Sequence, residues 1–313
     1  MSASNLKIGW IGAGRMGAQL VTRLLDAGYD VTVYNRTASK AQELADRGAS
    51  VVTRPVDLAD RDLVFTMVSS SNDLEEVMLG DGGLLTGESS PRVIADASTV
   101  SGEASALIRE AANSRGSDFL ATPVSGNPKV ITAGKLTVAV SGPREVFDSI
   151  EPVLNVFGRG VTYVGEGEVA RLVKIAHNLM LGVVTQCLAE ITVLVEKGGV
   201  SRADFLAFLN DSVMGSTFTQ YKSPAFVNLD FSPTFTMKLL QKDFDLGLDA
   251  AHELEAPMPI CSATRQIVAQ AEGAGEHADK DFATLLLEVA RGAGIALVPE
   301  NVPVDDGLAP VRS

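Results

Sequence analysis

The feature that most restricts the fold is a glycine-rich run near the start of the chain, Gly12-Ala13-Gly14-Arg15-Met16-Gly17. It follows a short apolar run at 7–11 and opens a helical stretch over 16–27. In such a unit the first glycine permits a tight turn, the second lets the backbone approach a pyrophosphate, and the third lets helix and strand pack closely. The helix N-terminus then directs backbone N–H groups at the anion. We predict that residues 12–17 bind a dinucleotide; the alternative is a glycine turn without a ligand.

Strand-like and helix-like segments alternate through the first half of the chain. The predicted strands are 7–11, 30–34, 63–67, 93–96, 119–121, 136–141 and 161–164. Helices are predicted between these strands, including 16–27, 38–47, 102–115 and 144–157. This alternation is typical of an α/β fold, here a Rossmann-type doubly wound parallel sheet covered by helices on both faces.

The alternation stops near Gly165, and the second half has a helical pattern only. A long helix over 168–196 should end at Gly198-Gly199, and helices are expected over 202–209, 237–254, 260–272 and 282–290. We therefore predict three parts: a cofactor-binding domain over 1–165, an all-helical substrate and oligomerisation domain over 166–298, and a loose tail over 299–313.

Composition excludes several classes of function. The net charge of −13, with no basic run, argues against nucleic-acid binding. Polar residues interrupt the apolar stretch 179–195, which favours a buried helix over a membrane span. The chain has two cysteines, Cys187 and Cys261, and its histidines lack metal-ligand spacing. We expect a cytoplasmic protein with no metal site.

The residues after the second strand indicate which dinucleotide is used. NAD-binding proteins usually place Asp or Glu there to accept a hydrogen bond from the ribose 2′-hydroxyl. This chain has Asn35-Arg36-Thr37, which has no carboxylate to repel a 2′-phosphate and has a guanidinium to bind one. The pattern favours NADP. The alternative is that Arg36 is a solvated surface residue and its neighbours are capping groups.

Two further loops follow predicted strands, where ligands collect in a doubly wound sheet. Thr99 is placed to contact the nicotinamide end of the cofactor, or else it caps the following helix. Ser125, Gly126 and Asn127 offer a hydroxyl and backbone N–H groups, a combination of donors that can bind a carboxylate, although such a run is also a common turn.

Polar residues recur at helical spacing at the start of the long helix. Arg171, Lys174 and Asn178 should share one face. A lysine beside a cofactor can exchange a proton, and an asparagine can orient a substrate without adding charge. The alternative is a solvated polar stripe. His177 lies about 100° from Asn178 around the helix axis, so we expect it to be a packed or partly exposed histidine and not a catalytic base.

Taken together, these motifs resemble the β-hydroxyacid dehydrogenase family, which includes 3-hydroxyisobutyrate dehydrogenase and glyoxylate/succinic semialdehyde reductase. Four motifs occur in the family's order over nearly the whole chain: the glycine loop, Pro-Val-Ser-Gly at 123–126, Gly165-x-Gly167 leading to Lys174 and Asn178, and Lys242-Asp243. The resemblance implies a Rossmann-type domain, a connecting helix and an all-helical domain, assembled as a homodimer or homotetramer.

The resemblance also implies a role for each matching residue. Ser125, Gly126 and the residue at 127 should hold the substrate carboxylate, Lys174 should be the general acid/base, and Asn178 should position the substrate. Lys242 should reach the cofactor or the substrate, with Asp243 supporting its helix. Two departures bear on the substrate pocket: Ala121-Thr122 replaces an acidic residue and alanine, and Asn127 replaces a second glycine.

The predicted activity is an NADP(H)-dependent hydride transfer to or from a small 3-hydroxy acid or aldehyde or keto acid. An imine reductase of the same architecture is one alternative; those enzymes usually carry Asp or Tyr where Lys174 stands. A non-catalytic NADP-binding module that mediates association is the other, and such modules tend to lose the lysine.

Overall fold

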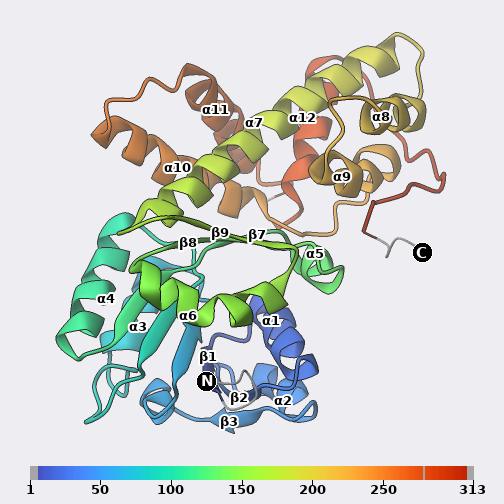
Figure 1. Cartoon of the computed structure of the whole chain (residues 1–313). Helices are drawn as coiled ribbons and strands as arrows, with labels where there is room; N and C mark the ends of the chain where they lie inside the picture. Colours follow the sequence, from blue (N-terminus) through green and yellow to red (C-terminus); the bar gives the residue numbers. More distant parts are fainter. Residues whose placement is uncertain (1–5, 278, 309–313) are drawn as a thin grey trace. The chain divides into compact units, whose positions relative to one another are not determined.

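The computed structural model describes residues 6–277 and 279–308, which form two compact units. Unit 1 extends to Lys174 and unit 2 begins at Ile175, so the division falls inside a long helix (Figure 1). The predicted domain boundary after residue 165 stays a prediction.

Unit 1 is built on one nine-stranded sheet with the order β3-β2-β1-β4-β5-β6-β8-β7, in which β9 also pairs with β8. Its strands are β1 (Lys7–Ile11), β2 (Asp30–Tyr34), β3 (Ser50–Val52), β4 (Leu63–Thr66), β5 (Val93–Asp96), β6 (Asp118–Ala121), β7 (Val124–Ser125), β8 (Thr137–Ser141) and β9 (Gly160–Gly165). The order reverses at β1, between β2 and β4. That reversal makes the end of β1 the switch point at which doubly wound sheets bind ligands.

The expectation of a wholly parallel sheet is wrong at one edge. Strands β1 to β6 pair in parallel, but β8 is antiparallel to both β6 and β7. A parallel return needs a long crossover, usually a helix of several turns. Between β6 and β8 the chain forms only the two-residue β7 and the five-residue α5 (Pro128–Thr132), so it returns in the opposite direction.

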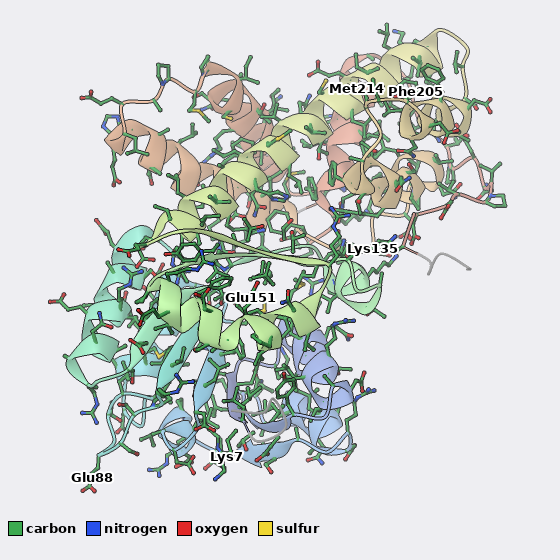
Figure 2. All side chains as sticks on the ribbon, in the orientation of Figure 1. Lys7, Glu88, Lys135, Glu151, Phe205 and Met214 are labelled. Carbon is green, nitrogen blue, oxygen red and sulfur yellow. The ribbon has the colours of Figure 1, made fainter. Side chains whose placement is uncertain are left out.

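Apolar side chains on alternate strand positions form a core on each face of the sheet, as predicted. The helices of unit 1 besides α5 are α1 (Arg15–Asp26), α2 (Ser39–Ala45), α3 (Ser71–Leu79), α4 (Gly102–Ser114) and α6 (Arg144–Leu154). Trp10 and Phe65 lie in one core, with helices α1, α2, α5 and α6, and their ring centroids are 5.3 Å apart. Val64 and Ile94 point to the opposite core, with α3 and α4. Charged side chains such as Lys7 and Glu88 are exposed around this unit (Figure 2).

Within the described residues, unit 2 is helical except for one isolated bridge between Thr236 and Asp281. Its helices are α7 (Val169–Lys197, which begins in unit 1), α8 (Arg202–Asp211), α9 (Thr217–Asn228), α10 (Met237–Glu253), α11 (Pro259–Gly273) and α12 (Leu285–Gly292). By length and composition α7 could span a bilayer, but half of its most apolar window is buried, which favours the interpretation as a core helix. Apolar residues of α7 enter both cores of unit 2.

Residues 299–308, which belong to the predicted loose tail, are hydrogen-bonded to the helices of unit 2. The Glu300 carboxylate accepts hydrogen bonds from the backbone N–H groups of Arg202 (2.7 Å) and Ala203 (3.1 Å), the first residues of α8. The buried Arg202 guanidinium donates to the carbonyls of Phe226, Val227 and Val298. The segment up to residue 308 is therefore held against unit 2, while 309–313 lie outside the described residues.

Candidate functional site

The three glycines of the β1–α1 loop have different surroundings. A Cβ on Gly12, at φ +103°, would lie 2.2 Å from the Met67 carbonyl oxygen, and one on Gly17 would lie 2.0 Å from the Gly12 oxygen. Beside Gly14 no heavy atom lies within 4 Å of the Cβ position. The first and third glycines are therefore required by packing, while the space at the second is open, as a pyrophosphate-binding loop needs.

The backbone amides that follow this loop lie at the N-terminus of α1, the helix end at which anions bind. Helix α1 begins at Arg15, and its first intrahelical bond runs from the Ala18 N–H to the Gly14 carbonyl (2.9 Å), so the amides of 15–17 precede the regular ladder. The predicted contact at Ala13 differs, because its N–H donates to Asn35 Oδ1 (2.8 Å). That bond joins the loop to the residue that follows β2, so the Ala13 N–H is already engaged within the protein.

This difference among the glycines predicts two separable defects. Gly17→Ala should lower the free energy of unfolding by about 1–3 kcal/mol or more, because the new methyl group overlaps a backbone oxygen. Gly14→Ala should leave the melting temperature unchanged but weaken NADPH and NADH binding by about tenfold, or 1.4 kcal/mol, because the methyl enters the open space. Thermal melts and fluorescence titrations would check both. Wild-type cofactor affinity in Gly14→Ala would contradict this role for the loop.

Arg36, the candidate for 2′-phosphate binding, lies at the surface. Its side chain is 75% exposed, and its Nη1 donates to Asp73 Oδ1 at 2.9 Å. Asp73 lies in the first turn of α3, where Ser70 accepts a hydrogen bond from the Asp73 N–H. Exposed ion pairs of this kind contribute about 0–1 kcal/mol. An incoming phosphate could therefore take Arg36 from Asp73 at small cost.

The loop after β5 is fixed by buried polar groups. Asp96 is fully buried and accepts hydrogen bonds from Thr66 Oγ1 (2.5 Å) and Ser98 Oγ (2.7 Å). Thr99 follows and is half-buried. The alternative role for Thr99 as a helix cap is wrong, since Ser101 caps α4 by accepting from the Ala104 N–H (3.2 Å).

The candidate carboxylate site lies between β7 and α5. Ser125 ends β7, Gly126 is exposed with φ +145°, and Asn127 caps α5 through Oδ1, which accepts from the Val130 N–H at 3.0 Å. Asn127 is 5% exposed, and its buried Nδ2 has no hydrogen-bond partner among the described residues. A buried donor without a partner costs free energy, so an acceptor from a ligand would be stabilised there.

At the start of α7 the predicted polar face separates into two environments. Arg171 is 3% exposed, and its Nη2 donates to Asp96 Oδ2 at 2.6 Å, so it does not share a solvated face with Lys174. Its Nη1 donates to the Ser98 carbonyl (2.9 Å). Lys174 is half-buried one turn further along the helix. Local spacing could not show this pairing, because the partners are 75 residues apart.

In unit 2 the predicted residues Asn178 and Asp243 are in direct contact. Asn178 Nδ2 donates to Asp243 Oδ2 at 2.5 Å, and its Oδ1 lies 2.9 Å from His177 Nδ1. Both Asn178 and Asp243 are buried, whereas His177 is exposed. Lys242 Nζ is 3.6 Å from Asp243 Oδ1, and its side chain is 33% exposed. Asp243 was expected to support helix α10, and through its bond to Asn178 it also connects α10 to α7.

Two family models together match most of the chain. The model for the NAD-binding domain of 6-phosphogluconate dehydrogenase matches residues 7–165. The model for the NAD-binding domain of NADP-dependent 3-hydroxyisobutyrate dehydrogenase matches residues 165–289. The two matches meet at Gly165, where the predicted change from alternating strands and helices to helices alone occurs.

Individual proteins agree with these models. Glyoxylate/succinic semialdehyde reductase 1 of Arabidopsis thaliana is 30% identical over 90% of this chain and 97% of its own length. The 2-(hydroxymethyl)glutarate dehydrogenase of Eubacterium barkeri is 33% identical over 84% of this chain and 88% of its own. The solved 3-hydroxyisobutyrate dehydrogenase of Mycobacterium tuberculosis with L-serine is similar with a TM-score of 0.78 at 27% identity, covering 91% of this chain and 99% of that one.

Proposed function

Because the chain belongs to the β-hydroxyacid dehydrogenase family and is thus an NAD(P)-dependent hydroxyacid dehydrogenase, we propose that it uses NADP(H), with Lys174 as general acid/base. The proposed substrates are small 3-hydroxy acids and the matching aldehyde or keto acids. The relatives named above act on hydroxy or aldehyde acids, and the mycobacterial structure holds L-serine, itself a 3-hydroxy acid.

The observation that carries the proposal is the bond between Arg171 and the Ser98 carbonyl (2.9 Å). It ties the α7 turn that carries Lys174 to the loop that carries Thr99, at the edge of the sheet where a dinucleotide binds. The open space at Gly14 fits the pyrophosphate of that dinucleotide. When bound, NADPH supplies the hydride.

The residues of this chain then hold the substrate and move the proton. Ser125, Gly126 and the unpaired Nδ2 of Asn127 donate to the substrate carboxylate. The Lys174 ammonium gives its proton to the carbonyl oxygen of the substrate as the hydride reduces the carbonyl carbon. In the oxidative direction the Lys174 amine takes the proton from the substrate hydroxyl. Asn178 orients the reacting oxygen, and Lys242 contacts the cofactor or the substrate.

Arg36 should set the preference for NADP. In Arg36→Gln the KM for NADPH should rise about tenfold. The variant loses one charge-assisted contact to the 2′-phosphate, which contributes about 1.5–3 kcal/mol. Part of that gain is already offset in the wild type, because Arg36 must leave Asp73 to make the contact. The KM for NADH should stay near wild type. Initial rates with both cofactors would measure this, and an equal change in both KM values would contradict the role of Arg36.

An NADPH-oxidation screen over glyoxylate, succinic semialdehyde and related aldehyde acids, repeated with NADH, tests the whole proposal. We expect turnover on an aldehyde acid with NADPH and little on a cyclic imine. Turnover of the imine alone would favour an imine reductase, and cofactor binding without any turnover would favour an association module. We further propose that the protein is a homodimer or homotetramer. We also propose a cytoplasmic location, which suits the free thiols of Cys187 and Cys261.

A further inference from the structure

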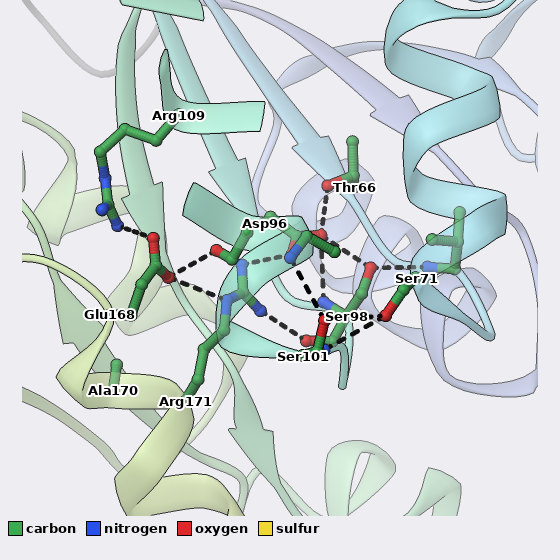
Figure 3. A network of polar contacts seen from close by, with 12 residues as sticks. Thr66, Ser71, Asp96, Ser98, Ser101, Arg109, Glu168, Ala170 and Arg171 are labelled. Carbon is green, nitrogen blue, oxygen red and sulfur yellow. Dashed lines mark hydrogen bonds and ion pairs between the residues drawn. The ribbon is translucent and has the colours of Figure 1, made fainter. Parts of the chain in front are cut away.

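A chain of ionic contacts links the end of β5, the start of α7 and the helix α4 (Figure 3). We refer to it as the Arg171 network, whose members are Thr66, Asp96, Ser98, Ser105, Arg109, Glu168 and Arg171. All of its members belong to unit 1. The family resemblance assigns no role to these residues.

Arg171 lies at the centre of this network and uses three different nitrogens. Its Nε donates to Glu168 Oε2 (3.1 Å), its Nη1 to the Ser98 carbonyl (2.9 Å), and its Nη2 to Asp96 Oδ2 (2.6 Å). A guanidinium is planar and its donors have fixed directions, so three acceptors define both its position and its orientation. An ammonium could supply the charge but not this geometry.

The inner acceptors of Arg171 are themselves held in place. Asp96 accepts from Thr66 and from the N–H and hydroxyl of Ser98, and Ser98 Oγ accepts from the Val68 N–H (2.9 Å). The Ser98 carbonyl, which contacts Arg171, belongs to the peptide bond that precedes Thr99. Arg171 therefore connects a rigid strand-end loop to its own turn of α7.

The outer acceptor, Glu168, joins this turn to α4. Its Oε2 accepts from Ser105 Oγ (2.5 Å), and its other oxygen pairs with Arg109. Two carboxylates and two guanidiniums make the network electrically neutral overall. Lys174, three residues after Arg171 on the same helix, is thus one turn from a balanced cluster, so the network acts on it through geometry more than through net charge.

We propose that Arg171 is a positioning residue for catalysis, which holds the α7 turn of Lys174 in register with the Ser98–Thr99 loop, and that Glu168 fixes the orientation of its guanidinium. The inference rests on the proposed role of Lys174 as the general acid/base. A shift of about 1 Å in a reacting group can reduce the rate about 100-fold. The three hydrogen bonds of the Arg171 guanidinium should therefore affect turnover more than cofactor binding.

The test compares Arg171→Lys with Glu168→Gln. Arg171→Lys keeps the positive charge but loses the three directed donors of the guanidinium. The matched control is Arg144→Lys, the same substitution in an exposed pair with Asp148 on α6. For each protein kcat, KM, the NADPH dissociation constant and stoichiometry, and amide hydrogen exchange over 97–101 are measured well below the melting temperature. We expect a kcat about 10–100-fold lower in Arg171→Lys, a smaller loss in Glu168→Gln, and wild-type values in the control.

Faster exchange over 97–101 with a nearly unchanged NADPH dissociation constant would support the positioning role. Wild-type kcat in folded Arg171→Lys would overturn it, as would a loss of turnover that only matches a loss of NADPH-binding stoichiometry. If Arg171→Lys does not fold, Glu168→Gln decides: lower kcat per binding site supports the proposal and wild-type kcat overturns it. The parent function is tested separately, because it fails if the wild type turns over no aldehyde acid or if Lys174→Met keeps full activity.

Discussion

Replacing Lys174 with methionine is expected to lower kcat about 100- to 10,000-fold, which is the range that a general acid/base contributes. Methionine keeps most of the length of the side chain and an apolar stem, but it has no group that can carry a proton. The dissociation constant for NADPH should stay close to the wild-type value, because the proposed partner of Lys174 is the substrate oxygen. Single-turnover hydride transfer and an NADPH titration measure the two quantities separately.

Lys197→Met provides the matched control for this experiment. Lys197 ends the same helix α7, and its exposed side chain donates a hydrogen bond from Nζ to the Ala293 carbonyl (2.9 Å). We expect wild-type turnover from this variant. Full activity in Lys174→Met would remove Lys174 from the mechanism, even if the substrate class is correct.

Replacing Lys222 with methionine is expected to destabilise unit 2 by about 3–5 kcal/mol, the cost of leaving one partner of a buried ion pair uncompensated. Lys222 Nζ lies 2.5 Å from Asp281 Oδ1, and both residues are almost fully buried. Asp281 Oδ2 also accepts from Thr234 N–H and Oγ1. Chemical denaturation followed by helix content would measure the loss. Arg47→Met, in an exposed pair with Asp26, should change stability by less than about 1 kcal/mol.

The same pair predicts a dependence on pH. Burial by itself would raise the pKa of Asp281, but the Lys222 ammonium and hydrogen bonds from Lys222, Thr234 and Ala283 hold this pKa below its usual value. A lowered folded-state pKa contributes stability above the unfolded pKa of about 3.9, and this stability is lost as the pH falls through the lower folded value.

In Lys222→Met the opposite sign applies, because burial remains and the ammonium is gone. The pKa of Asp281 should then rise, so protonation relieves the buried charge in mildly acidic solution. The stability difference between wild type and variant should be largest near neutral pH and should shrink as the pH approaches 4. A difference that stays constant across this range would contradict the ionic account of the pair.

The sequence predicts the regular parts of this fold well. Strands β1, β2 and β5 have the predicted bounds, and α7 is within a residue of its predicted ends. Several elements have no predicted range, among them α3 and α5. Others have weak local signals, since β3 and β7 have three and two residues and α9 contains Pro224, which ordinarily ends a helix. Antiparallel β8 could not be predicted because strand direction depends on how the chain returns.

The candidate site was predictable where local spacing carries the information. The glycine loop and the lysine of α7 lie where strand–loop–helix patterns place them. Arg171 was predicted to share a face with Lys174, but its carboxylate partner Asp96 lies 75 residues away and turns it into the interior. The pairing of Arg36 with Asp73, 37 residues apart, was missed for the same reason. Helical periodicity describes one helix and carries no information about the charges packed against it.

The contacts of Glu300 have a practical consequence for any shortened version of this protein. A chain truncated at residue 297 would remove the carboxylate that caps α8 and one carbonyl that receives the Arg202 guanidinium, while leaving that cation enclosed by helices. The irregular C-terminal stretch is thus an integral part of the second folding unit, and a recombinant domain that ends before it should be less stable than one that includes it.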